Sequence, residues 1–556
     1  MKLCRIAVAM SAISFVCGCG GGGSGTVTTT GGGGSPDMGT LHAVDDSDQY
    51  TLMNAASGME LGISGQSQTA GTDLVQEATA TTTTDVDWHF IPMNNDVYNI
   101  ENMLTHQVMG VSNASTAAGA QVLQYSDNGT NDHLWQFYLL SDGNYLIKNA
   151  NSGLYLEDAN SNTTSAATID QNDRATSGSG CTCQEWKLTS TGNAAYPSPL
   201  PVSGTGIYVH DPFMLQDPVT HIYWLYGTHQ TLAYSTDLST FTYTTLSTPD
   251  GACTQAEGTY WLTDASHCPI IGPDFASWSG LQTPPSDNSG KNIDVWAPSL
   301  LYADGTYYQY YAIPYEPSTG AEAVIGLATS TTAWGPWTDM GFVVTSWSNA
   351  TSPVPSPNPW GFTSTTTWNA IDPAPFADAS GNWWLVYGSW SDGIRVLQLQ
   401  TPSTATSSST IGFPVSANTG SWTKVAYRSA GEEGPFIYPW IVNGTQYYFY
   451  FAPIDVCCDG TSSTYRTIVG RSTSPSGPFV DRGGVALLSG GGTILVSSHS
   501  NFFGPGGASV FTDTGANGSS SIPTIVYHYY DGNNNGTPTV GINRLGFTSD
   551  GWPYLE

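Results

Sequence analysis

The sequence predicts an all-β protein with two repetitive domains, a threefold barrel followed by a five-bladed propeller. Only 10% of the 556 residues are charged, whereas Gly (63), Tyr (30) and Trp (18) are abundant, a composition typical of aromatic strands joined by many turns. Three segments of about 50 residues repeat between 45 and 190, and aromatic strands recur five times between 205 and 556. Long helical patterns are absent from the sequence.

The length and the charge limit the functions that this chain can have. A chain of 556 residues is expected to contain two or three domains. The net charge is −31, with 13 basic against 44 acidic residues, and such a surface repels phosphate backbones. We therefore expect no binding to nucleic acid, and the charge agrees better with a neutral substrate than with an anionic one.

The N-terminus is typical of an exported lipoprotein. A basic start precedes an apolar run, Ile6–Val16, that is too short for a membrane-spanning helix. Residues 16–19 (VCGC) resemble a bacterial lipobox, which implies cleavage before Cys19, a lipid on that cysteine, and anchoring at the outer membrane or cell surface. The alternative is plain secretion. The segment 1–19 is thus the predicted signal peptide, and the Gly/Ser/Thr-rich segment 20–44 the predicted tether.

The remaining cysteines favour disulfide bonds. An even number in an oxidising compartment is more typical of disulfides than of metal binding, and no spacing matches a zinc site. The six are Cys181, Cys183, Cys253, Cys268, Cys457 and Cys458. We expect Cys253 and Cys268 to close a loop, and the adjacent Cys457 and Cys458 to form a vicinal disulfide.

Three tryptophans mark the repeats of the first predicted domain, residues 45–190. Trp88, Trp135 and Trp186 each close a segment and lie 47 and 51 residues apart. Each segment opens with an apolar strand before a turn. Since no copy of this size buries its own apolar face, three copies predict a closed threefold barrel with these tryptophans in its core.

This pattern resembles the ricin-type β-trefoil lectin fold, which implies a carbohydrate-binding module. The Gln-x-Trp mark of that family is kept only at residues 184–186. The position of the family's sugar-binding Asp is Gly62, Gly110 and Glu157 in the three copies. Sugar binding is therefore expected only in the third copy, with Glu157 and Trp186 as the candidate residues.

A linker rich in Pro, Gly and Ser, residues 191–204, leads to the second predicted domain, residues 205–556. Five aromatic strands recur there at intervals of roughly 65 to 85 residues, which predicts a five-bladed propeller; a large β-sandwich is the alternative. The strands are 222–226, 306–310, 382–387, 446–450 and 525–529.

Three carboxylates recur just before these strands. Asp211, Asp372 and Glu433 lie 11 to 14 residues upstream of an aromatic strand, and a Pro and an aromatic residue follow each of them. Equivalent positions in successive blades surround the central channel, so the three acids are expected to meet at one end of it. Such clustering of like charge is typical of a catalytic site, and a protonated and an ionised carboxyl group suffice for glycoside hydrolysis.

The second domain resembles glycoside hydrolases of family 43, and within them the endo-1,5-α-L-arabinanases. The motifs that carry this resemblance are His210-Asp211-Pro212, Val295-Trp296-Ala297-Pro298, Ile325 to Ala328, Gly335-Pro336-Trp337, Asn369 to Pro373, Gly388-Ser389-Trp390, Cys457 to Gly460, Ser463-Thr464-Tyr465, Val469 to Ser472, Gly490 to Thr493, Tyr527 to Asp531 and Gly551-Trp552-Pro553. The resemblance implies an inverting hydrolase on a five-bladed propeller.

The resemblance also implies residue roles. Asp211 is similar to the family's general base, Glu433 to its general acid, and Asp372 to the residue that tunes the pKa of the acid and orients it. Glu432 competes for the role of acid but does not fit the Glu-Gly-Pro pattern. Three further residues are candidates for contact with substrate: Trp296, Asn369 and Ser389.

Two departures from the family concern the channel. The family's Trp-Ala-Pro-Asp ends in Ser299 here, and its Gly-Pro-Gly-His, whose His holds a channel metal usually taken as calcium, ends in Gly507. A calcium ion in the channel therefore stays an open alternative, with His499 or His528 in place of the family's histidine, and no cofactor is expected for the chemistry. The segment beginning at Asp531 resembles the start of a calcium loop but lacks its Glu, so a hairpin turn is expected there.

We thus expect a monomer that acts on plant cell-wall arabinan or pectin side chains. Two alternatives stay open. One is an exo-acting α-L-arabinofuranosidase or β-xylosidase, which the insertion at 341–368 would favour if it blocked one end of the cleft. The other is a non-catalytic surface protein that binds glycans, which the three intact carboxylates disfavour.

Overall fold

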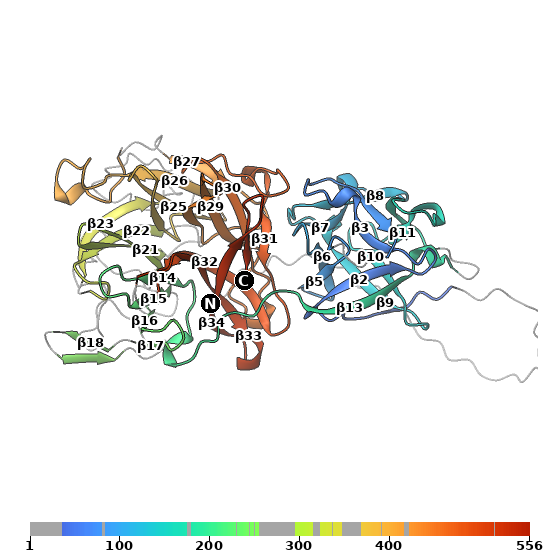
Figure 1. The fold of residues 1–556 in the computed structure, drawn as a ribbon, viewed down its shortest axis with the longest axis horizontal. Coiled ribbons are helices and arrows are strands. Elements are labelled where there is room, and N and C mark those ends of the chain that lie inside the picture. The colour runs from blue at the N-terminus through green and yellow to red at the C-terminus, as the bar shows by residue number, and fades with distance from the viewer. Residues whose placement is uncertain are drawn as a thin grey trace, which may run out of the picture.

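The computed structural model consists of two β bodies that lie side by side (Figure 1). The N-terminal body, blue to green in Figure 1, is a single 13-stranded sheet, and the C-terminal body contains five four-stranded sheets. No α-helix occurs among the described residues, and none of them forms a helix long and apolar enough to cross a membrane. The structure describes residues 36–79, 84–174, 180–228, 231–243, 245–248, 251–254, 295–314, 323–335, 337–346, 369–390, 392–415, 422–515 and 518–556.

The first body is the predicted trefoil. Its strands are β1 (Thr40–Leu41), β2 (Asp48–Asn54), β3 (Glu60–Ile63), β4 (Leu74–Glu77), β5 (Trp88–Met93), β6 (Val97–Asn102), β7 (Val108–Val111), β8 (Ala120–Tyr125), β9 (Trp135–Leu139), β10 (Tyr145–Asn149), β11 (Tyr155–Asp158), β12 (Ile169–Asn172) and β13 (Trp186–Ala194). Short 3-10 turns separate some of them: η1 (Ser64–Gln66), η2 (Ser112–Ala114), η3 (Asn131–His133), η4 (Ala159–Ser161) and η5 (Thr182–Gln184).

Trp88, Trp135 and Trp186 occupy equivalent places in the trefoil core. Each begins a strand, is fully buried, and donates its indole N–H to a backbone carbonyl about 3.0 Å away. The threefold prediction is confirmed by this repetition. It also corrects one candidate: Trp186 cannot contact a sugar, because its ring is enclosed by the core.

The second body is the predicted five-bladed propeller. Its sheets are β14 (Phe213–Gln216), β15 (Tyr223–Gly227), β16 (Thr231–Ser235) and β17 (Thr242–Tyr243); β20 (Trp296–Ala303), β21 (Thr306–Pro314), β22 (Ala323–Ser330) and β23 (Thr338–Thr345); β24 (Ala374–Ala377), β25 (Trp383–Ser389), β26 (Gly393–Leu399) and β27 (Trp422–Ala426); β28 (Phe436–Val442), β29 (Thr445–Ile454), β30 (Arg466–Ser472) and β31 (Thr493–Val496); and β32 (Phe502–Asp513), β33 (Ile522–Asp531), β34 (Thr537–Phe547) and β35 (Pro553–Leu555). All neighbours in a sheet are antiparallel.

The predicted aromatic strands are the second strands of the five blades, β15, β21, β25, β29 and β33. The first strands, β14, β20, β24, β28 and β32, each contact the first strand of the next blade, and together they form a closed ring around the channel. The short hairpin β18 (Thr245–Thr248) and β19 (Gly251–Thr254) lies outside these blades, and 3-10 turns occur at η6 (Thr205–Ile207), η8 (Ser408–Thr410), η10 (Gly460–Ser462), η11 (Leu487–Ser489) and η12 (Gly532–Asn534). The hairpin predicted at Asp531 is confirmed, since η12 joins β33 to β34.

The two segments predicted as tether and linker are more ordered at their ends than the sequence suggested. β1 lies within 20–44 and pairs with β9, so the trefoil begins at Thr40. In the segment 191–204, Tyr196 is only 4% exposed and belongs to the propeller core. Further along the same segment, the amide of Leu200 donates a hydrogen bond to Ile542 O in the last blade. Packing of its apolar side chains therefore overrides the turn-forming composition.

Disulfide bonds join Cys181 to Cys183 and Cys457 to Cys458. The vicinal pair confirms that prediction. The predicted bond from Cys253 involves Cys268, which lies outside the described residues, as does Cys19.

Candidate active site

Five residues with left-handed backbone surround one end of the channel. In each blade, the first strand is entered or bent at a residue with φ between 41° and 58°. These residues are Asp211, Ala297, Asp372, Gly434 and Gly507. A non-glycine residue in this region is uncommon and costs energy, and such strain concentrates at functional sites.

Together these residues line one open cleft. Each blade contributes a short segment that starts at its left-handed residue: 211–213, 297–299, 372–374, 434–436 and 507–509. The structure therefore brings Asp211 and Asp372 together as expected. Glu433 differs in detail, because Gly434 and not Glu433 is the equivalent of the two aspartates; the longer Glu side chain comes from one residue earlier.

Asp211 is held as an ionised carboxylate. Its Oδ2 accepts hydrogen bonds from His210 Nδ1 at 2.9 Å and from the hydroxyl of Thr228 at 2.7 Å. Burial by itself raises the pKa of this carboxyl, but His210, His528 and Thr228 outweigh burial and hold the pKa well below its usual range. Oδ1 faces Gly507, and a Cβ added there would lie only 2.7 Å away from it. Oδ2 of Asp211 is thus held by two hydrogen bonds, and the space beside Oδ1 stays open because residue 507 is a glycine.

Glu433 has the opposite electrostatic character. Its Oε2 accepts from the Ser389 hydroxyl at 3.0 Å, and its Oε1 accepts from the Tyr465 hydroxyl. Burial and the charge of Asp211 raise the pKa of Glu433 to about 7, against the opposing effect of Ser389. A carboxyl group with this pKa is partly protonated near neutral pH, as a general acid must be.

Asp372 completes the group. Its Oδ2 accepts from the amide of Gly434 at 2.9 Å. Burial, then the charges of Glu433 and Asp211, raise the pKa of Asp372 well above its usual range. Since Asp211 is ionised, a proton is retained by the Asp372–Glu433 pair. The three carboxyls therefore form one ionised group and one coupled pair that retains a proton.

The expected substrate residues lie close to this group. Ser389 is almost fully buried, and its hydroxyl donates a hydrogen bond to Glu433. Asn369 is buried, and its side-chain oxygen has no partner among the described residues. Trp296 is half-buried at the start of β20 and packs beside Ile371. Glu432 is buried and accepts from Tyr450 at 2.5 Å, so it is directed away from the cleft group and does not replace Glu433.

Sequence reasoning missed several residues that touch the carboxyls. Thr228 and Tyr465 each donate to one of them, and the exposed indole of Trp390 also bonds Glu433. Tyr530 bonds His210 Nε2 at 2.9 Å and accepts from the amide of Cys458 at 2.8 Å. Three of the missed residues, Trp390, Tyr465 and Tyr530, stand in motifs noted above, but no sequence pattern distinguished their contacts from structural ones.

The channel residues do not fit the metal of the wider family. A Cβ at Gly507 would lie 2.9 Å from Nδ1 of His528, so a histidine has no room there. Nδ1 of His528 accepts the amide N–H of Asp211 at 3.1 Å, and burial holds the pKa of His528 well below its usual range. A neutral His528 therefore carries its proton on Nε2 and has no free lone pair for a metal. His499 packs instead against Phe502 and Tyr196, and among the described residues it belongs to no group of three donor side chains that could hold a metal ion.

The third trefoil repeat retains a polar cluster. Glu157 accepts from Gln184 at 2.6 Å and from Asn172 at 3.4 Å. Asp158 and Asp170 lie beside it, and burial and the Glu157 charge raise their pKa values to about 6 and about 7. No such set of side chains replaces Gly110 in the second repeat, where His133 fills the space that a Cβ would need.

Comparisons with known proteins find a matching family for each of the two bodies. The model of glycosyl hydrolases family 43 matches residues 244–553, and that of the ricin-type beta-trefoil lectin domain-like family matches 40–125 and 131–197. The chain is 35% identical over 279 residues to the extracellular endo-alpha-(1->5)-L-arabinanase 1 of Bacillus subtilis, covering 50% of this chain and 72% of that one. It is 33% identical over 322 residues to the arabinan endo-1,5-alpha-L-arabinosidase A of Aspergillus niger, covering 54% and 88%. A solved GH43 endo-arabinanase from Bacillus licheniformis aligns with 27% identity and a TM-score of 0.46 over 64% of this chain and 99% of that one.

Proposed function

Because the chain belongs to the glycosyl hydrolases of family 43, we propose that it cleaves α-1,5-L-arabinofuranosyl linkages of arabinan. The observation that carries this is the group of acids at the cleft, where an ionised Asp211 interacts with the proton-bearing pair Asp372 and Glu433. Relatives named as arabinanases, with 33–35% identity, support the substrate class. Plant cell-wall arabinan or pectin side chains are the corresponding polymers.

The mechanism that we propose is single-step inversion. Asp211 removes a proton from water while the water attacks the anomeric carbon. Glu433 donates its proton to the departing glycosidic oxygen, and Asp372 tunes the pKa of this acid and orients it. This assignment agrees with the opposite pKa shifts of Asp211 and Glu433, since a base must be ionised and an acid protonated at the same pH.

Product analysis tests this mechanism. Linear arabinan is digested, and the anomer released is followed by NMR while the fragment sizes are measured. Inversion predicts a β-configured product at first, and endo action predicts short oligomers at early times. Only monomer would favour the alternative, an exo-acting α-L-arabinofuranosidase or β-xylosidase. No release from arabinan or from aryl glycosides would refute hydrolysis and favour a non-catalytic glycan-binding protein.

Two isosteric variants test the roles. Glu433→Gln and Asp211→Asn each remove one acid–base group, and each is expected to lose at least about 10²–10⁴-fold in kcat on the polymer. Glu432→Gln is the matched control, because Glu432 lies next in sequence but bonds Tyr450 in the interior. Activity that survives Glu433→Gln but not Glu432→Gln would exchange the two assignments.

We also propose that the hydrolysis needs no metal ion. The support is the donor set, in which Gly507 replaces the family histidine and His528 has its lone pair engaged by the amide of Asp211. The protein is dialysed against a chelator, assayed, and assayed again with calcium added. Unchanged rates are expected; a loss that calcium restores would contradict the proposal.

The trefoil and the N-terminus suggest how the enzyme reaches its substrate. We propose that the third repeat binds a glycan through Glu157, and that Cys19 carries a lipid that anchors the protein to a cell envelope. Glu157→Gln should weaken retention on insoluble arabinan without changing kcat on soluble oligosaccharides. Cys19→Ala should move the protein from the membrane fraction to the soluble one, and equal fractionation of both forms would refute the anchor.

A further inference from the structure

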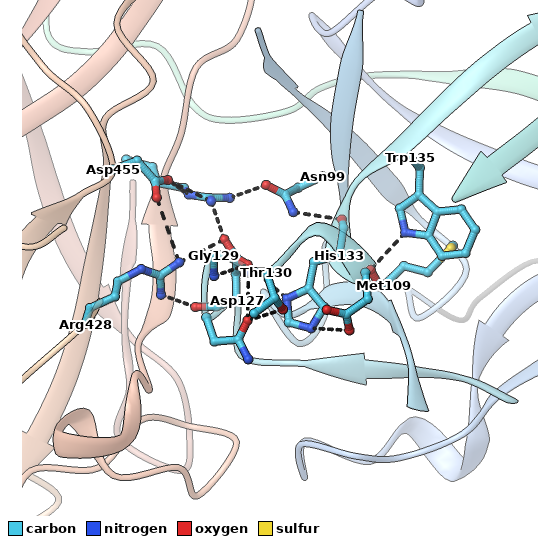
Figure 2. A network of polar contacts seen from close by, with 12 residues as sticks. Asn99, Met109, Asp127, Gly129, Thr130, His133, Trp135, Arg428 and Asp455 are labelled. Atoms are coloured by element: carbon cyan, nitrogen blue, oxygen red, sulfur yellow. Dashed lines mark hydrogen bonds and ion pairs between the residues drawn. The ribbon is translucent and has the colours of Figure 1, made fainter. Parts of the chain in front are cut away.

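The trefoil docks on the propeller through an ion cluster centred on Asp127 (Figure 2). Asp127 lies in the loop after β8 of the second trefoil repeat, and its side chain is 2% exposed. Its Oδ2 accepts from Arg428 at 3.0 Å and from Arg466, both of which belong to the propeller. Its Oδ1 accepts from His133 at 2.9 Å, within the trefoil. A single carboxylate therefore joins the two bodies.

The cluster is balanced only when the trefoil is present. Arg428 and Arg466 are buried, and in the described part of the propeller the carboxylate that pairs with them is Asp455, at 3.9 Å and 2.8 Å. Two guanidinium groups thus share one propeller carboxylate, and Asp127 supplies the second. A buried charge without compensation is strongly unfavourable, so the loss of Asp127 would leave two guanidinium charges against the single carboxylate of Asp455.

Other contacts hold the same face. Tyr196, in the segment between the bodies, donates to Glu101 of the trefoil at 2.6 Å and contacts Ser497 of the propeller at 3.1 Å. Ile91 and Val108 pack against Ile494 of β31. The second repeat therefore packs against the propeller, whereas the cluster around Glu157 belongs to the third repeat.

Both arginines are close in sequence to groups that hold the catalytic acid. Arg428 begins the short segment that ends at Glu433, and this segment is bonded through Gly431 O to the amide of Asp455. Arg466 directly follows Tyr465, whose hydroxyl donates to Glu433. Each guanidinium group is therefore connected to the acid, or to a side chain that bonds it, through no more than five residues of chain.

We propose that Asp127 of the trefoil is a positioning residue for the acid Glu433, so that the trefoil is a structural part of the active site as well as a binding module. The inference rests on the proposed hydrolysis, because its readout is the rate of that reaction. Asp127 touches neither the carboxyls nor the cleft, and acts through Arg428, Arg466 and Tyr465.

The experiment compares Asp127→Asn with Tyr196→Phe in the full-length protein. Both variants remove one polar bridge between the bodies, but only the first removes a carboxylate from the two arginines, which then share Asp455 alone. Melting temperature, kcat, KM and the pH profile are measured with linear arabino-oligosaccharides well below the melting temperature. Asp127→Asn should lower kcat about tenfold or more with KM within twofold, since a small misplacement of a catalytic group costs this much.

The pH profile separates positioning from simple destabilisation. The groups that face Glu433 are Asp211, His210, Ser389, Trp390 and Tyr465, with Asp372 coupled to it. None of them changes in either variant. An unbalanced arginine pair adds positive potential, so the alkaline limb should move to lower pH in Asp127→Asn and stay in place in Tyr196→Phe.

The outcomes are distinguishable from a failure of the proposed function. A wild-type protein without activity on arabinan would refute that function, while a folded Asp127→Asn with the wild-type kcat and pH profile would overturn only the positioning role. If Asp127→Asn does not fold, Arg428→Lys takes its place, because it keeps the charge but loses the paired contact with Asp127. Wild-type kcat in that variant overturns the proposal equally.

Discussion

Removal of the Ser389 hydroxyl should shift the alkaline limb of activity upward. Ser389 donates to Oε2 of Glu433 at 3.0 Å, and a hydrogen bond to an ionised carboxylate favours that form and lowers its pKa. In Ser389→Ala this effect is lost, so the pKa of Glu433 rises from its value of about 7. A hydrogen bond to a charged group is worth about 1.5 kcal/mol at the low end, which corresponds to about one pKa unit.

The assay is kcat/KM on linear arabinan across pH, because this ratio reports the pKa values of the free enzyme. Activity should fall as the pH rises through about 7 in the wild type and about one unit higher in Ser389→Ala. Ser299→Ala is the matched control, since Ser299 lines the same cleft but donates to the carbonyl of Pro373. An alkaline limb that stays in place or moves down in Ser389→Ala would refute the assignment of Glu433 as the titrating acid.

Two further variants follow from the packing. Gly507→Ala should lose activity, because its Cβ would lie 2.7 Å from Oδ1 of Asp211, whereas Gly444→Ala, also left-handed but with open space around it, should stay active. Both variants should lose about 1–2 kcal/mol of stability in denaturant unfolding, because each places a side chain on a left-handed backbone. An active Gly507→Ala would show that Oδ1 of Asp211 is unimportant for the reaction. Trp186→Ala should lower the free energy of unfolding of the trefoil by about 3–5 kcal/mol, measured by the same method, and a surface-like loss below about 1 kcal/mol would contradict its buried position.

The sequence by itself determined the architecture. The repeats of tryptophan in the trefoil and of aromatic strands in the propeller are local patterns, and each copy buries its apolar face only against its neighbours, so their number and order predict both folds. The same repetition placed Asp211 and Asp372 at one phase of their blades, where the structure confirms equivalent left-handed residues. The prediction for Glu433 was off by one residue, because Gly434 and not Glu433 has the backbone position equivalent to Asp211 and Asp372.

Only the tertiary structure decided what surrounds the carboxyls. The amide of Asp211 bonds a histidine 317 residues later, and Asp127 meets Arg428 and Arg466, which lie 301 and 339 residues beyond it. Sequence periodicity reports which face of a strand is buried, over a few residues at a time. It carries no information on which distant side chains meet once five blades close into a ring and a trefoil docks beside them. The pKa values of the acids depend on these contacts between distant residues, and the contacts form only when the blades pack into the closed ring.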